Sequence, residues 1–135
     1  MLRVGTIVGI SLAATAVAFG AGGNAQGRQG SEFEQLLARH RRDISTPAGQ
    51  AYQHAFTVHY TAGFGAVLGA CIQQSGPPSS FEIIYIIDKD GRITRAVAKV
   101  PTPLTACVIE AAQRDTFPKP PFSPFHQHVV QNFGP

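Results

Sequence analysis

The chain has little charge and few cysteines. Its 135 residues carry 11 Lys and Arg against 8 Asp and Glu, which gives a net charge of +3. So small an excess does not indicate a nucleic-acid-binding surface, because such a surface neutralises many phosphates. The two cysteines, Cys71 and Cys107, show neither the spacing of a zinc site nor a Cys-x-x-Cys redox motif. We therefore expect no nucleic-acid partner and no cysteine-bound metal.

Catalytic motifs are missing as well. The glycine-rich segments 20–30 and 61–69 lack the spacing of a phosphate-binding loop. No His-Glu-x-x-His motif occurs, and none of the loop serines stands in a nucleophile elbow. These serines are Ser75, Ser79, Ser80 and Ser123. The sequence therefore predicts a protein that is not an enzyme and that has no cofactor.

The N-terminal residues are apolar. After Arg3, no charge occurs from Val4 to Ala21, and the residues at 23–25 have the small side chains that a signal peptidase requires. The apolar stretch is short for a membrane span of roughly 20 residues. We expect residues 1–25 to be a cleaved signal peptide and the protein to be periplasmic or secreted. A retained leader would instead hold it at the membrane.

Export changes the interpretation of the two cysteines. In an oxidising compartment an even number of cysteines favours a disulfide, here Cys71–Cys107. The loop that it closes implies a stabilisation of about 4 kcal/mol in the chain-entropy model. Buried free thiols are the alternative.

Residues 26–46 are expected to be a flexible N-terminus that contains a short basic helix. Ser31 and Glu34 form a capping box, and an apolar stripe follows at helical spacing. The stripe consists of Phe33, Leu36, Leu37 and Ile44. The basic run at 39–42 is typical of a solvated helix face. We place the folded domain at residues 47–135.

The segment from 47 to 75 has a helical pattern with a weak point. Pro47 is a favourable first helical residue. Gly63 and Gly65 each lower helix stability by up to about 1 kcal/mol relative to alanine. We therefore expect two helical segments with a kink or break near residues 61–65. This stretch is uncharged, but its polar rings and glycines make it a poor membrane span, and we expect it to lie on a sheet.

The C-terminal part predicts a small antiparallel sheet. The run 81–88 is apolar on both faces, which is typical of a central strand. A turn ending in Gly91 leads to a second strand, 93–100, whose inward residues change register near Thr94, as a bulge does. The residues expected to face inward are Ile93, Ala96, Ala98 and Val100.

A helix and a last strand complete the pattern. Pro103 begins an apolar helical stripe that includes Cys107, and the proline-rich segment 117–121 ends it. The fold class is thus α+β, with a hairpin at 81–100 and a C-terminal strand at 125–133 packed by helices. The disulfide would join two helices on one face of the sheet.

This order of elements resembles the C-terminal domain of TonB-like proteins. The residues Gly-Arg-Ile-Thr-Arg-Ala-Val-Ala at 91–98 resemble the hairpin return of that family, and residues 106–120 resemble its second helix and Phe-Pro-x-Pro exit. The paired cysteines are most similar to the AgmX-type domains of gliding-motility and other envelope proteins. The long proline-rich spacer of TonB transducers is missing, so the resemblance implies an envelope interaction module rather than an energy transducer.

The family resemblance also implies a mode of binding. An envelope protein or peptide would add an extended segment to a sheet edge, and the strand from 126 to 133 is the expected edge. The partner-binding residues would be His126, His128, Val129, Val130 and Phe133. Three alternatives stay open: the edge is covered, His126 and His128 chelate copper or zinc from one strand face, or the protein is a structural accessory subunit.

Overall fold

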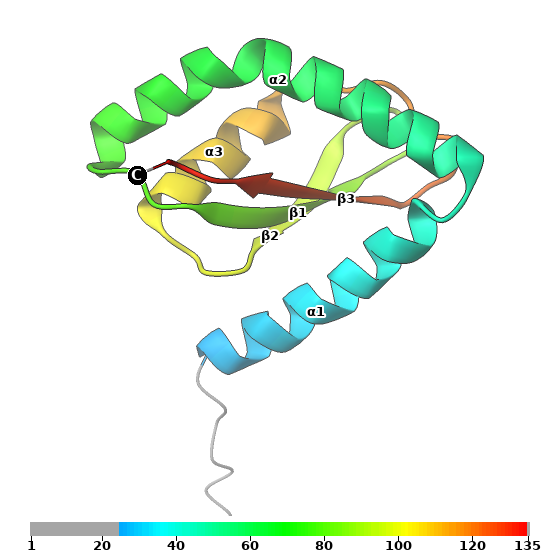
Figure 1. Ribbon diagram of the computed structural model, residues 1–135, viewed down its shortest axis with the longest axis horizontal. Helices are drawn as coiled ribbons and strands as arrows, with labels where there is room; N and C mark the ends of the chain where they lie inside the picture. Colours follow the sequence, from blue (N-terminus) through cyan, green and yellow to red (C-terminus); the bar gives the residue numbers. More distant parts are fainter. Residues whose placement is uncertain (1–24, 135) are drawn as a thin grey trace, which may run out of the picture.

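A computed structural model of the protein describes residues 25–134 (Figure 1). The predicted signal peptide at 1–25 therefore lies outside the described residues, except for Ala25. Three helices and three strands follow one another along the chain. They are α1 (Ala25–Asp43), α2 (Pro47–Ser75), β1 (Phe81–Ile87), β2 (Ile93–Ala98), α3 (Pro103–Arg114) and β3 (Phe125–Gln131). The expected α+β class is confirmed.

The strands form one antiparallel sheet in the order β2-β1-β3, with helices on both faces. Figure 1 shows α2 and α3 on one side of the sheet and α1 on the other. On the first side Ile83, Tyr85 and Ile87 are buried in the main hydrophobic cluster. On the second side Ile84 belongs to a smaller cluster. The central strand is thus buried on both faces, as its apolar sequence predicts.

The smaller cluster makes α1 part of the domain. Phe33 and Leu36 of α1 are buried against Ile84 and Val97 of the sheet. The prediction from the sequence puts the start of the folded domain at residue 47 and assigns residues 26–46 to a flexible N-terminus. That boundary is wrong, because the apolar stripe of α1 covers the second face of β1.

The hairpin forms as its turn residues predict. Gly91 has φ 83°, and a Cβ at this position would lie 2.0 Å from the carbonyl oxygen of Phe117, so glycine is required there. Ile86 pairs with Arg95 and Ile87 with Ile93, which leaves Thr94 as the extra residue of the expected bulge. Val100 was expected to face inward, but β2 ends at Ala98 and Val100 is 62% exposed.

Helix α2 is continuous, so the predicted break near residues 61–65 is wrong. A β-carbon on Gly63 or Gly65 would meet no atom within 4 Å, so neither glycine is required by a close contact. On the inner side Phe56, Tyr60 and Phe64 stack in sequence along the helix. This packing on both sides of the glycines outweighs their low helix propensity.

The length and composition of α2 would also suit a membrane span, and it is the one helix of the described residues for which this holds. Its four buried residues lie against the rest of the domain. They are Gly49, Tyr52, Phe56 and Cys71.

A disulfide joins α2 to α3 on the same face of the sheet. Cys71 and Cys107 have sulfurs 2.07 Å apart and Cα atoms 5.7 Å apart. The predicted bond is confirmed, and it connects the C-terminal end of α2 to the first half of α3.

Removing the disulfide should lower the free energy of unfolding. The bond closes a loop with a sequence separation of 36 residues. The chain-entropy model gives about 4 kcal/mol for such a loop. We expect the double variant Cys71→Ser/Cys107→Ser to lose on the order of 3–4 kcal/mol in urea unfolding followed by circular dichroism. A loss below about 1 kcal/mol would contradict a structural role for the bond.

Candidate interaction edge on strand β3

Strand β3 is an edge strand, because within residues 25–134 it pairs only with β1. In an antiparallel ladder every second residue turns its N–H and C=O away from the neighbouring strand. The backbone groups of His126 contact α1, and Glu82, which lies opposite Val130, gives its C=O to the N–H of Lys99 on the β2 side. The outward residues of β3 are therefore His126, His128 and Val130.

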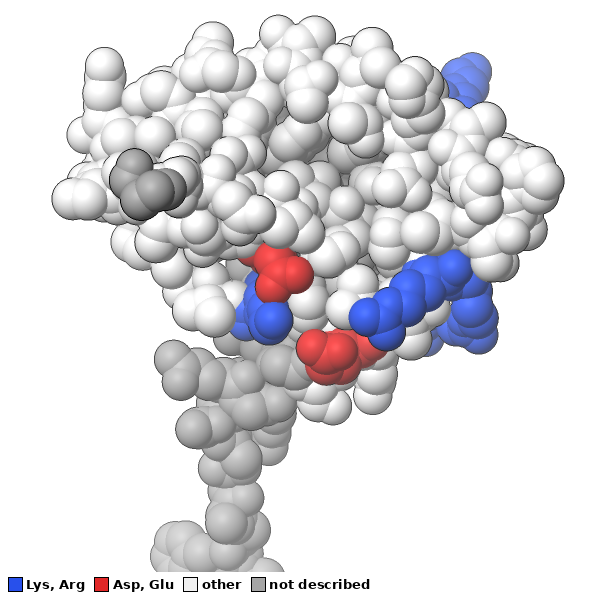
Figure 2. Space-filling model, viewed as in Figure 1, with Lys and Arg blue, Asp and Glu red and all other residues white. Residues whose placement is uncertain are grey.

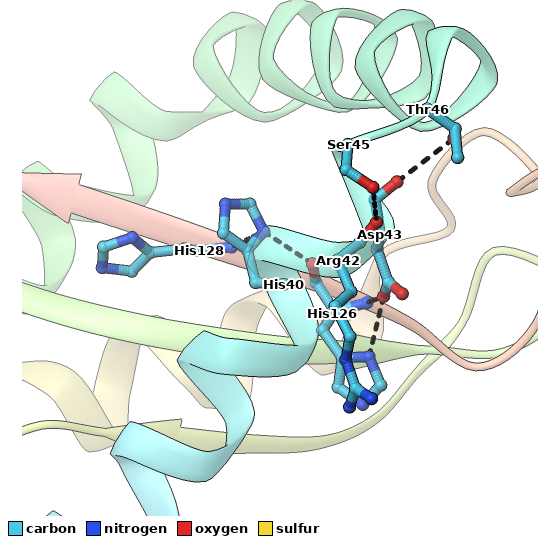
Figure 3. Close-up of polar contacts among 7 residues, drawn as sticks. All are labelled: His40, Arg42, Asp43, Ser45, Thr46, His126 and His128. Atoms are coloured by element: carbon cyan, nitrogen blue, oxygen red, sulfur yellow. Dashed lines mark hydrogen bonds and ion pairs between the residues drawn. The ribbon is translucent and has the colours of Figure 1, made fainter.

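The end of α1 covers the first half of this edge (Figure 3). The N–H of His126 donates to the carboxylate of Asp43 at 2.9 Å. The C=O of His126 accepts a hydrogen bond from Nδ1 of His40 at 2.8 Å. The alternative that the edge is covered is thus correct for this half of the strand. Two side chains of α1 occupy the positions that the backbone of an added strand would take.

The corner between α1 and α2 positions these side chains. Ser45 Oγ donates to the C=O of Arg42 at 2.6 Å, and Thr46 Oγ1 accepts from the N–H of Gly49 and so caps α2. A Cβ on Gly49 would lie 1.7 Å from the carbonyl oxygen of Asp43. The two helices therefore approach closely here, which holds Asp43 next to β3 (Figure 3).

Three histidines lie where α1 crosses β3, and the rings of two of them are in contact. The His40 and His128 rings are 5.7 Å apart between centroids. His126 Nδ1 lies 2.8 Å from the Asp43 carboxylate, and His128 Nε2 lies 3.1 Å from that of Glu82. We call His40, His126 and His128 the histidine cluster. Two of its rings have a carboxylate partner, and the ring of His40 has none within hydrogen-bonding distance among the described residues.

The hydrogen on His40 can be assigned from distances. A contact of 2.8 Å with a carbonyl oxygen requires that Nδ1 carries the hydrogen. The N–H of His128, which lies 3.3 Å from the same atom, then has no lone pair to donate to. We therefore take the carbonyl of His126 as the partner of His40.

Burial and neighbouring charges shift the pKa values of His40 and Glu82. Burial desolvates the ring of His40 and lowers its pKa from 6.5, and the nearby rings of His128 and His126 act in the same direction. The hydrogen bond to the carbonyl of His126 and the charge of Asp43 raise this pKa, but burial outweighs them. The hydrogen bond from Lys99 lowers the pKa of the Glu82 carboxyl. His40 is thus held neutral above mildly acidic pH.

The arrangement gives no support to a metal site. Within residues 25–134 no three His, Cys, Asp or Glu side chains are placed to hold a metal ion. His126 and His128 do share the α1 side of the sheet, as their spacing predicts, but each ring binds a different carboxylate.

The second half of the edge is open. Among the described residues, none takes up the outward N–H and C=O of Val130, whose side chain is 51% exposed. A groove runs beside it, between β3 and α2. It is lined by His128, Val129, Val130 and Gln131 and, from α2, by Phe56, Thr57, Tyr60, Thr61 and Phe64. The groove wall on α2 was not predicted; the aromatic spacing on an uncharged helix was its signal.

Two of the predicted partner-binding residues, Val129 and Phe133, are partly buried against the core. Val129 packs against the main cluster on the α2 side. The ring of Phe133 lies 6.2 Å from that of Phe81, and its N–H donates to Ser80 Oγ. His126 is buried under α1, and the ring of His128 packs against Phe33 and His40 of α1, so the open edge retains Val130.

The groove lies on a weakly charged face. Helix α2 contains no Asp, Glu, Lys or Arg. Figure 2 shows charged side chains gathered on the α1 side of the sheet, while the surface over α2 carries almost none. Comparisons with protein-family models, curated proteins and solved structures find no match to the chain.

Replacing Asp43 should loosen α1 from the sheet. The variant Asp43→Ala leaves the N–H and the ring of buried His126 without an acceptor, which costs about 1–3 kcal/mol. We expect faster amide exchange in α1 and in the first half of β3. The control Asp115→Ala removes an exposed pair with His59 and should change stability by less than about 1 kcal/mol. Equal exchange in both variants would contradict the role of Asp43.

Proposed function

We propose that the chain is an exported, non-catalytic interaction module of the cell envelope, related to TonB-like C-terminal domains. In this proposal it binds an extended segment of an envelope protein by strand addition to β3. The observation that carries the proposal is the outward backbone of Val130 beside the groove of α2, which no other described residue pairs with. An unpaired strand edge presents donors and acceptors that a second strand can use directly.

The groove favours a partner whose side chains are apolar. A strand paired with Val130 would direct alternate side chains toward Tyr60 and Phe64 of α2. Both rings are partly exposed and belong to the border of the main cluster. Because α2 lacks charge, apolar or aromatic side chains of the partner could be buried there without a desolvation penalty. Charged side chains would have no opposite charge on α2 to pair with. The partner is therefore an extended peptide with apolar residues at alternate positions.

The order of elements supports the family assignment. A hairpin, a helix and a final strand on the central strand follow one another as they do in the sequence pattern of TonB-like domains. The disulfide between the helices before and after the hairpin agrees with export, because such bonds persist in oxidising compartments.

Proline at position 130 should prevent strand addition. The N–H of Val130 points away from β1, so Val130→Pro removes a donor to the partner and leaves the ladder with β1 intact. We expect at least about tenfold weaker binding of partner peptides, which corresponds to about 1.4 kcal/mol. Val130→Thr keeps the N–H and the β-branched shape and is the matched control.

A photo-crosslinking residue at 130 would identify the partner in cells. We expect one recurring envelope protein in the adducts at 130 and none from a crosslinker at the exposed turn residue Lys89. Adducts that do not change in the proline variant, or no adducts at 130, would remove strand addition as the function.

A further inference from the structure

The histidine cluster has fewer carboxylates than imidazole rings. When all three rings are protonated, three positive charges face two carboxylates, those of Asp43 and Glu82. Glu82 is shared, because its second oxygen binds the ammonium of Lys99 at 3.0 Å. Protonated His126 and His128 gain an ion pair each, whereas protonated His40 gains none. Protonation in acid therefore destabilises the packed position of His40.

The carboxylate of Asp43 acts on the ring of His40 through space and raises its pKa, but burial of the ring outweighs this effect. The ion pair of Arg95 on β2 with Glu32 lies in the N-terminal half of α1, away from His40, and is internally neutral. The remaining charges on the C-terminal half of α1 are positive and exposed. They are Arg39, Arg41 and Arg42. No further acidic side chain of the described residues binds the ring of His40.

We propose that α1 is an acid-released cover of the β3 edge. At neutral pH its C-terminal end occupies the outward groups of His126, and mild acid releases it by protonating His40. Release exposes the whole edge from His126 to Val130, whereas only the part at Val130 is open while α1 is packed. The consequence for peptide binding rests on the proposed function; the release itself does not.

The direction of the effect follows from linkage. In the released state His40 is exposed to water and has its ordinary pKa of 6.5; packed against β3 it has a lower pKa because of burial. The released state therefore binds the proton more tightly. The packed state is fully favoured above pH 6.5, loses stability as the pH falls through 6.5, and stops losing it below the lowered pKa.

Release of α1 leaves the rest of the fold in place. The helix contributes Phe33 and Leu36 to the smaller cluster, while the main cluster lies on the other face of the sheet. The disulfide joins α2 and α3, which also lie on that face. Release exposes Ile84 and Val97, which α1 covers in the packed state.

The test is an NMR titration of the full chain from about pH 7.5 to about pH 5 without any partner. We expect the amide resonances of α1 and of His126 and His128 to lose their native positions below about pH 6.5, while those of α2 and α3 keep them. In His40→Asn the side-chain amide takes the place of Nδ1–H, donates to His126 and does not titrate. In that variant α1 should stay packed over the whole range.

Two results would overturn the proposal. One is an α1 that stays packed at about pH 5 in the wild-type chain; the other is a His40→Asn variant that releases α1 in the same pH range as the wild type. If the asparagine variant does not fold at neutral pH, the wild-type titration still decides. Peptide binding at neutral pH to Val130 tests the proposed function separately, since that half of the edge is open when α1 is packed.

Discussion

Strand β1 must be covered on both faces, and the arrangement of the other elements follows from this requirement. Ile84 and Tyr85 are neighbours in sequence, point to opposite faces and are both fully buried. Each large apolar side chain gains about 1.5–3 kcal/mol from burial, so neither face can be left in water. Helices α2 and α3 cover one face and α1 covers the other. A sheet of three strands then has β1 in the middle and two strands with an outer edge.

One helix consequently has two tasks. The apolar side of α1 completes the core, and its polar C-terminal end binds the backbone of His126 at the sheet edge. Natural sheets protect their edges with charges, proline or a covering element. Here the cover reaches only the first part of β3, because α1 crosses the sheet obliquely toward Arg95 of β2. The stability of α1 and the accessible length of the edge are therefore linked.

Features that depend on neighbouring residues were predictable from the sequence, and those that depend on distant ones were not. The turn at Gly91 and the bulge at Thr94 are encoded within a few residues of themselves. The continuity of α2 past Gly63 depends on rings that pack on the sheet, which the local helix propensity does not report. The contacts of His40 and Asp43 with β3 join residues 86 and 83 positions apart, so no local pattern contains them. The strand that carries the edge was predicted; the helix end that covers half of it was not.

The position of the disulfide has a mechanical consequence. The bond ties α2 to α3, and a tension applied at Ala25 reaches α1 first. The hydrogen bonds of His40 and Asp43 to His126 resist that tension together with the small apolar cluster, without any covalent support. The N-terminal helix would therefore detach under load, while α2 and α3 stay joined by the covalent bond. A pull from the N-terminal side would lengthen the exposed edge of β3 without unfolding the remainder of the domain.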